Sequence, residues 1–316
     1  MDSHSKVNGL SGVSVLMAAY NVAPYIAEAL DSVLVQKHPH LEIVVVNDGS
    51  PDTIELERVL APYNKYIKYV KQDNQGVAGA RNAAVAASSG DLLAVLDPDD
   101  IWEPDYLRIQ LDTLKANATA SVVYCNGTYF GETHLRGKLY TDCYPSEGPV
   151  TFESVCLSKC NIFCGNLMRR TSFTQVGGYD AKYGKGCEDI DLYLRLLLAG
   201  KEIVYHAHPI YRYRQRASGQ LTGNEAQLIY NLIEVLTSLA RTRSLLPSQQ
   251  RAVDLRLKRE RSRLAVIAGK NALLAGDVLK ARELLTDASD KNGTLKLLLI
   301  RLAVAVVPGM VTRLTR

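Results

Sequence analysis

The sequence predicts an open α/β sheet flanked by helices, followed by an all-α C-terminal region. In residues 13–223, short apolar runs without polar alternation, typical of strands buried on both faces, alternate with patterns of helical spacing. From residue 224 onward the apolar spacing is helical throughout. We therefore expect an α/β domain over residues 13–223, a helical region over 224–316 and a polar N-terminal tail over 1–12.

Five buried strands are expected in the α/β domain, each ended by polar or turn-forming residues. They are Val13–Ala18, Leu41–Asn47, Ile67–Lys71, Leu92–Leu96 and Val122–Cys125. The helices between them are expected from Pro24, with Asn21 as N-cap, and over residues 53–60, 76–88 and 104–116. An irregular excursion follows over residues 126–190, and then a helix over 189–200 and short strands at 203–205 and 210–214.

Charge is distributed unevenly along the chain. Residues 1–240 carry 21 basic and 27 acidic side chains, for a net charge of −6, whereas residues 241–316 carry 16 and 6, for +10. This distribution argues against a uniformly basic nucleic-acid-binding protein. The 47% of hydrophobic and 22% of charged residues exclude a disordered chain and a polytopic membrane protein.

The basic C-terminal region is expected to form helices over residues 225–243, 248–275, 278–289 and 295–307. The stretch 295–311 is apolar but is interrupted by Lys296, Arg301 and Pro308, which favours an interfacial helix on an anionic membrane surface over a span or a packed helix. Residues 1–12 lack the apolar segment of a secretory signal. We therefore expect a cytoplasmic protein, peripheral on the cytoplasmic face of the membrane.

Polar clusters follow three of the predicted strands at the point where each strand ends. Tyr20-Asn21 follows the first strand, Asp48-Gly49-Ser50 the second and Asp97-Pro98-Asp99-Asp100 the fourth. Ligands of open α/β sheets bind outside the carboxyl ends of the strands. The sequence therefore predicts a ligand site at this edge.

The acidic cluster at residues 97–100 is the main candidate for a metal site. Three carboxylates in four residues repel one another, and Mg²⁺ and Mn²⁺ prefer oxygen ligands and bridge carboxylates to phosphates. The cluster is therefore expected to hold Mn²⁺ or Mg²⁺. The alternative is a turn whose Asp side chains cap the local backbone.

A second acidic group, Glu188-Asp189-Ile190-Asp191, opens a predicted helix. A carboxylate there could take the proton of an attacking hydroxyl as a general base, or it could simply cap the helix. Asp189 and Asp191 point to different sides of that helix, so only one is expected to face the site. Basic candidates for binding phosphate are Arg81, near a helix start at Gly76, and Arg214 in an alternating aromatic and basic run.

Taken together, these motifs resemble the family 2 glycosyltransferases, whose fold is GT-A. The resemblance spans about residues 13–218 and depends on the order and spacing of six segments. They are Ala18-Ala19-Tyr20-Asn21, Val46–Ser50, Asn74-Gln75-Gly76 with Ala80-Arg81-Asn82, Leu96–Asp100, Val176–Asp180 and Glu188–Leu192. The resemblance implies a GT-A-like open mixed sheet.

The resemblance also implies roles for individual residues. Tyr20 would stack on a nucleotide base, and Asp48 would accept a hydrogen bond from a uracil or thymine imide. Arg81 would contact the base or ribose, and Asp97 would lie near the ribose. Asp99, together with Asp97, would bind the metal. Asp189 would be the general base, with Asp191 as the alternative and Glu188 beside them. The remaining substrate-binding positions are Ala18, Asn21, Gly76 and, at the diphosphate, Arg214.

The implied activity is inverting transfer of a hexosyl group from a nucleotide sugar, with a UDP-sugar favoured. The acceptor would be a hydroxyl of a glycan or lipid-linked saccharide, in the biosynthesis of a cell-surface polysaccharide. Two other readings stay open: a sugar nucleotidyltransferase and a non-catalytic scaffold that binds nucleotide sugars. The first is disfavoured because the first strand is followed by Ala19-Tyr20-Asn21-Val22, without a Gly-rich basic loop. The intact acidic motifs argue against the second.

Overall fold

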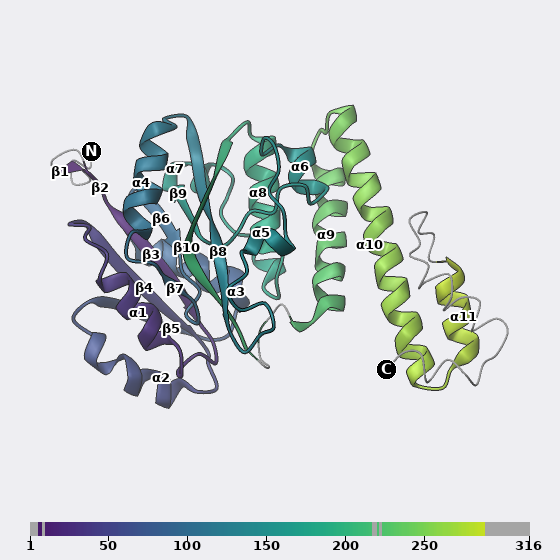
Figure 1. Ribbon diagram of the computed structural model, residues 1–316, viewed down its shortest axis with the longest axis horizontal. Coiled ribbons are helices and arrows are strands. Elements are labelled where there is room, and N and C mark those ends of the chain that lie inside the picture. Colours follow the sequence, from purple (N-terminus) through teal and green to yellow (C-terminus); the bar gives the residue numbers. More distant parts are fainter. Residues whose placement is uncertain (1–5, 8–9, 217–219, 221–222, 288–316) are drawn as a thin grey trace. The chain divides into compact units, whose positions relative to one another are not determined.

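The computed structural model describes residues 6–7, 10–216, 220 and 223–287 of the 316-residue chain. The chain divides into two units, Met1–Gly223 and Asn224–Arg316. The first unit contains an eight-stranded mixed sheet with helices on both sides, and the second is helical (Figure 1). An open mixed sheet followed by helices is the predicted architecture.

The sheet has the order β5-β4-β3-β6-β9-β8-β10-β7. Its first half is parallel and consists of β3 (Val13–Ala19), β4 (Leu41–Asp48), β5 (Ile67–Gln72) and β6 (Leu92–Val95). Its second half is mixed and consists of β7 (Ile101–Trp102), β8 (Ala120–Gly131), β9 (Asn166–Arg169) and β10 (Glu202–Gln215). A small separate hairpin pairs β1 (Lys6–Val7) with β2 (Leu10–Ser11), within the stretch expected as a tail.

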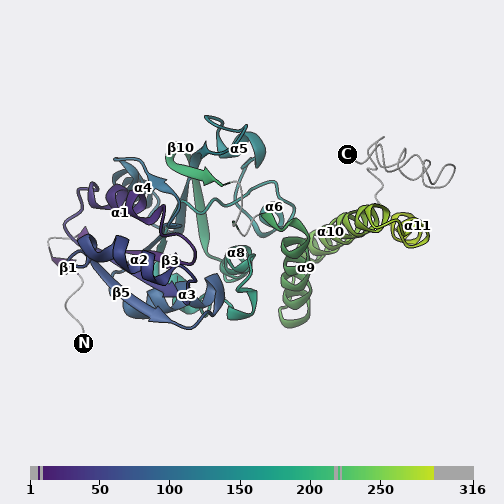
Figure 2. The same cartoon turned by 90° about the horizontal axis from the view of Figure 1, so that it is seen from below.

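Helices cover both faces of the sheet, and Figure 2 shows α1 and α4 on one side and α3 and α8 on the other. The longer helices are α1 (Ile26–Leu34), α2 (Thr53–Leu60), α3 (Gly76–Ala87), α4 (Tyr106–Ala116) and α8 (Glu188–Leu198). The shorter ones are α5 (Tyr140–Cys143), α6 (Phe152–Cys156), α7 (Arg170–Gln175), η1 (Ala61–Tyr63) and η2 (Ala181–Tyr183). The central strands β3 and β4 are almost wholly buried between these layers, as their unbroken apolar sequences predict.

The structure differs from the sequence-based expectation in three elements. Asn21 does not cap the first helix: it adopts a left-handed backbone (φ 54°), and α1 begins only after Tyr25. The strand β9, inside the excursion expected to be irregular, inserts antiparallel between β6 and β8. The two short strands expected at 203–205 and 210–214 are one strand, β10, because shifts of register near Pro209 preserve its pairing with β8.

The second unit contains α9 (Glu225–Thr242), α10 (Pro247–Leu274) and α11 (Val278–Asp287). The end of α10 packs on α11 around four buried apolar side chains, Ala272, Leu273, Ala281 and Leu285. Among the described residues, none of the helices combines the length and the hydropathy that crossing a membrane requires. The apolar stretch 295–311, expected to be interfacial, lies outside the described residues.

Candidate active site

The parallel strands end at one edge of the sheet, and the predicted nucleotide-binding residues lie there. Tyr20 follows β3 with half of its surface exposed, Asn21 is exposed and Ala18 is half-buried. Asp48, the last residue of β4, is buried, and its Oδ1 accepts hydrogen bonds from Gln72 Nε2 (2.7 Å) and Gln75 N (2.9 Å). Within the described part of the chain its Oδ2 makes no hydrogen bond and is available to a ligand.

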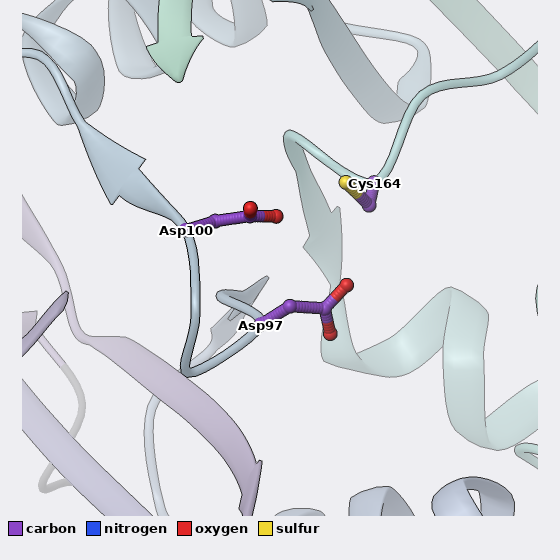
Figure 3. Close-up of side chains that lie close together, drawn as sticks. All are labelled: Asp97, Asp100 and Cys164. Carbon is purple, nitrogen blue, oxygen red and sulfur yellow. The ribbon is translucent and has the colours of Figure 1, made fainter. Parts of the chain in front are cut away.

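Asp97 and Asp100 lie together in a turn directly after β6. The amide of Asp100 donates to the carbonyl of Asp97 (2.9 Å), which closes the turn and brings its first and fourth side chains together. The ligand atoms of Asp97, Asp100 and Cys164 all lie within 4.8 Å of one another. Figure 3 shows both carboxylates projecting toward the same space, with the Cys164 thiol opposite.

Asp99, expected to bind the metal with Asp97, is not part of this group. Its carboxylate Oδ2 lies 3.2 Å from Arg216 Nε, and its carbonyl accepts a 2.6 Å hydrogen bond from Arg214 Nε. Arg214 also pairs with Glu28 (2.5 Å), and its amide donates to Asp100 Oδ1 (2.7 Å). Arg214, expected to contact a diphosphate, therefore lies at the acidic turn and bonds to protein groups there.

The donor set suits a hard divalent cation. Burial and the nearby carboxylates of Asp99 and Asp97 raise the pKa of Asp100 well above its ordinary value, because three negative charges crowd one buried turn. Burial, with Asp97 and Asp100 nearby, also raises the pKa of the Cys164 thiol, which stays protonated and is a poor ligand for Mg²⁺ or Mn²⁺. The carboxylates thus fit the predicted ion, and the thiol does not.

The N-terminus of α8 carries the predicted base. Asp189 is partly exposed and accepts a hydrogen bond from Ile190 N (2.7 Å), and burial raises its pKa although the charge of Arg81 opposes the rise. Asp191 is buried and forms a 2.6 Å ion pair with Arg195. The carboxylates of Asp189 and Asp191 therefore have different surroundings, and Asp191 forms a structural ion pair.

Arg81 has partners that the sequence did not suggest. Its Nη1 lies 2.5 Å from Glu188 Oε1 and its Nη2 lies 2.7 Å from Asp97 Oδ1, and its guanidinium lies 5.7 Å from the centroid of the Tyr179 ring. Burial raises the pKa of Glu188 to about 7, against the opposing charge of Arg81. Arg81 was expected to contact a nucleotide, and in the structure it bridges two carboxylates.

Gly76 begins α3 at a close approach between two backbone segments. Its φ is 76°, and an added Cβ would lie 2.5 Å from the carbonyl oxygen of Gly184. That carbonyl accepts a 3.1 Å hydrogen bond from Val77 N. The structure therefore explains Gly76 by the packing of α3 against the segment that precedes α8.

We expect Gly76→Ala to lower the free energy of unfolding more than Gly200→Ala, measured by urea denaturation. Both glycines have left-handed φ values, which cost a residue with a side chain about 1–2 kcal/mol. An added Cβ at Gly200 meets no atom within 4 Å, whereas at Gly76 it meets backbone. Equal losses in the two variants would contradict a role for the close approach.

Asp100 and Cys164 are the members of the acidic group that sequence reasoning missed. A signal for Asp100 was present in the motif, because proline favours the second position of a turn and Pro98 therefore predicts that residues 97 and 100 adjoin. No comparable signal existed for Cys164, which reaches the turn only because β9 inserts beside β6.

The arrangement of sheet, acidic turn and α8 is that of a GT-A-like glycosyltransferase. The family model described as glycosyl transferase family 2 matches residues 14–177, just over half of the chain. The chain therefore belongs to this family, as its motifs predicted.

Relatives and solved structures agree with this assignment. A poly-β-1,6-N-acetyl-D-glucosamine synthase of Staphylococcus aureus is 30% identical over 203 residues, which are 63% of this chain and 49% of that protein. Among relatives that are 37% identical, the match covers only 19% to 36% of the relative. The matched segment is thus a minor part of this chain and of those proteins.

Two solved structures resemble the chain along most of its length. S. aureus TarS 1–349, in complex with UDP-GlcNAc, has a TM-score of 0.64 at 16% identity and covers 96% of this chain and 90% of its own. The mannosyltransferase PcManGT from Pyrobaculum calidifontis, in complex with GDP-Man and Mn²⁺, has a TM-score of 0.58 at 19% identity and covers 96% and 84%. At these identities the likeness shows the fold, which confirms the predicted GT-A-like sheet.

Proposed function

We propose that this chain transfers a sugar from a nucleoside diphosphate sugar, with a UDP-sugar favoured, to a hydroxyl of a glycan or lipid-linked acceptor. The proposal depends on three features that lie together: the edge of the sheet where β3 and β4 end, the acidic turn at residues 97–100 and the start of α8. Asp48 offers a free carboxylate oxygen to an imide N–H, and Tyr20 offers an exposed ring after β3, the strand paired with β4. The solved relatives in complex with UDP-GlcNAc and with GDP-Man and Mn²⁺ support this class of donor.

The proposed reaction is one direct displacement. Asp189 accepts the proton of the acceptor hydroxyl, whose oxygen bonds to the anomeric carbon as the bond to the diphosphate oxygen breaks. The configuration at the anomeric carbon is therefore inverted. Asp191 is a weaker candidate for the base because its carboxylate is buried against Arg195.

Mn²⁺ or Mg²⁺ is the proposed cofactor, and the carboxylates of the 97–100 turn would hold it. Asp97 and Asp100 already face one space, and Asp99 would become available when Arg216 leaves it. An ion bound there would neutralise charge on the departing diphosphate. The protein's own contribution is to hold these carboxylates close together, with Asp99 and Asp100 buried, where they attract a cation strongly.

We further propose that residues 13–223 form the catalytic domain and that the basic helical region contacts an anionic membrane surface on the cytoplasmic side. A membrane-proximal acceptor, in polysaccharide biosynthesis, fits this arrangement. The polysaccharide synthase among the relatives supports that class of product. No feature of the described residues favours nucleic acid as a partner, and residues 1–240 carry the net charge of −6 already noted.

Calorimetric titration tests the donor. We expect UDP to bind in the presence of Mn²⁺ and to bind more tightly than ADP, because the Asp48 carboxylate can accept from the uracil imide and adenine lacks that donor. A panel of UDP-sugars, followed by release of UDP, then identifies the sugar. Absence of UDP binding with Mn²⁺ present would refute the proposed donor, whereas UDP binding without release of UDP from any UDP-sugar would favour the non-catalytic scaffold.

A further inference from the structure

Arg81 joins three parts of the site that are distant in sequence. It lies in the second turn of α3, its Nη2 bonds the acidic turn at Asp97, and its Nη1 bonds Glu188 at the start of α8. Only 8% of its side chain is exposed. One guanidinium therefore ties the turn proposed to hold the cation to the helix that carries the proposed base.

The bonding of Arg81 leaves little for a ligand. Its two terminal nitrogens face carboxylates, and its Nε is buried and makes no hydrogen bond in the described part of the chain. Arg81 donates a hydrogen bond only to Oδ1 of Asp97. The other carboxylate oxygen of Asp97, Oδ2, makes no hydrogen bond among the described residues. Arg81 thus orients the Asp97 carboxylate and leaves one of its oxygens for another partner.

We propose that Arg81 is a positioning residue, which holds Asp97 in the orientation that lets a bound cation strengthen nucleotide binding, without touching the nucleotide itself. The inference rests on the proposed function and adds to it a residue that acts through another. Its physical basis is the planar guanidinium, which presents separate nitrogens to two carboxylates in a rigid fork. A lysine keeps the charge but offers a single ammonium on a flexible stem, so Arg81→Lys removes the geometry alone.

The test measures UDP affinity by calorimetry with and without Mn²⁺, in the wild type and in Arg81→Lys. Without Mn²⁺, we expect the affinity of Arg81→Lys for UDP to stay within about twofold of the wild-type affinity. We expect the gain in affinity that Mn²⁺ confers to fall by about tenfold or more, the usual effect of removing a group that orients a metal ligand. A tenfold loss of metal-free affinity would overturn the proposal, because it would mean direct contact with the nucleotide.

Arg195→Lys is the matched control. Arg195 is about as buried as Arg81 and also forms an ion pair with a carboxylate of α8, but its other bonds go to the carbonyls of Val176 and Gly178. Both variants are expected to lose some thermal stability, and only Arg81→Lys should lose the Mn²⁺-dependent gain. A parallel loss in both variants, or an unchanged gain in Arg81→Lys, would show that Arg81 is merely structural.

If Arg81→Lys does not fold, Glu188→Gln provides the second test. It keeps the side-chain shape but removes the charge from one partner of the guanidinium, which weakens that hydrogen bond, so the Mn²⁺-dependent gain should fall in the same direction by a smaller factor. An unchanged gain in that variant would overturn the proposal. If the wild type binds no UDP, the proposed function itself is overturned. If the wild type binds UDP and the Mn²⁺-dependent gain is unchanged in the variants, only the proposed role of Arg81 is overturned.

Discussion

Replacing Asp189 with asparagine is expected to lower kcat by about 10²–10⁴-fold, the range that a positioned general base contributes. The amide has almost the same shape but cannot accept the hydroxyl proton. Asp189 is partly exposed at the start of α8, beside the Arg81 bridge, and burial raises its pKa toward the range in which a base works best. Affinity for UDP should change little, which titration of the same variant checks.

The control for this prediction is Asp191→Asn on the same helix. Asp191 is buried and bound to Arg195, so its loss should lower the unfolding temperature more than it lowers kcat per folded molecule. Retention of full activity by Asp189→Asn together with loss of activity in a stably folded Asp191→Asn would move the base to Asp191.

Removing the cation is the second change with a large expected effect. Exhaustive chelation, or Asp97→Asn, should reduce transfer by at least about 10²-fold, since metal stabilisation of the departing diphosphate is worth several kcal/mol. Activity after chelation should return when Mn²⁺ or Mg²⁺ is added back, and in Asp97→Asn it should not return at the same ion concentration. The measurement is the rate of UDP release from a UDP-sugar.

A matched variant, Asp105→Asn, controls for general loss of charge. Asp105 lies on the surface at the start of α4, paired with Arg108, and is outside the acidic turn. It should leave transfer and its metal dependence unchanged. Wild-type activity that survives chelation would refute the proposed cofactor while leaving the family assignment intact.

The parallel half of the fold was accessible to sequence reasoning because its signals are local. Strands β3 and β4 are unbroken apolar runs, and each is followed by polar residues that fall at the carboxyl edge of the sheet. The other half was harder, since β9 has only four residues and its identity as a strand depends on pairing with β6 and β8. Sheet pairing is a long-range interaction that no short window of sequence contains.

The sequence by itself determined the class of this protein, since its acidic motifs and their order along an alternating α/β pattern identified the family. It also separated Asp189 from Asp191 onto two sides of a helix. Only the tertiary structure decided what these carboxylates meet: Asp97 with Asp100 across a turn, Asp99 with Arg216, and Arg81 between Asp97 and Glu188. The physical reason is that ion pairs between residues up to 117 positions apart depend on the packing of α3, α8 and β10, and composition and spacing do not encode that packing.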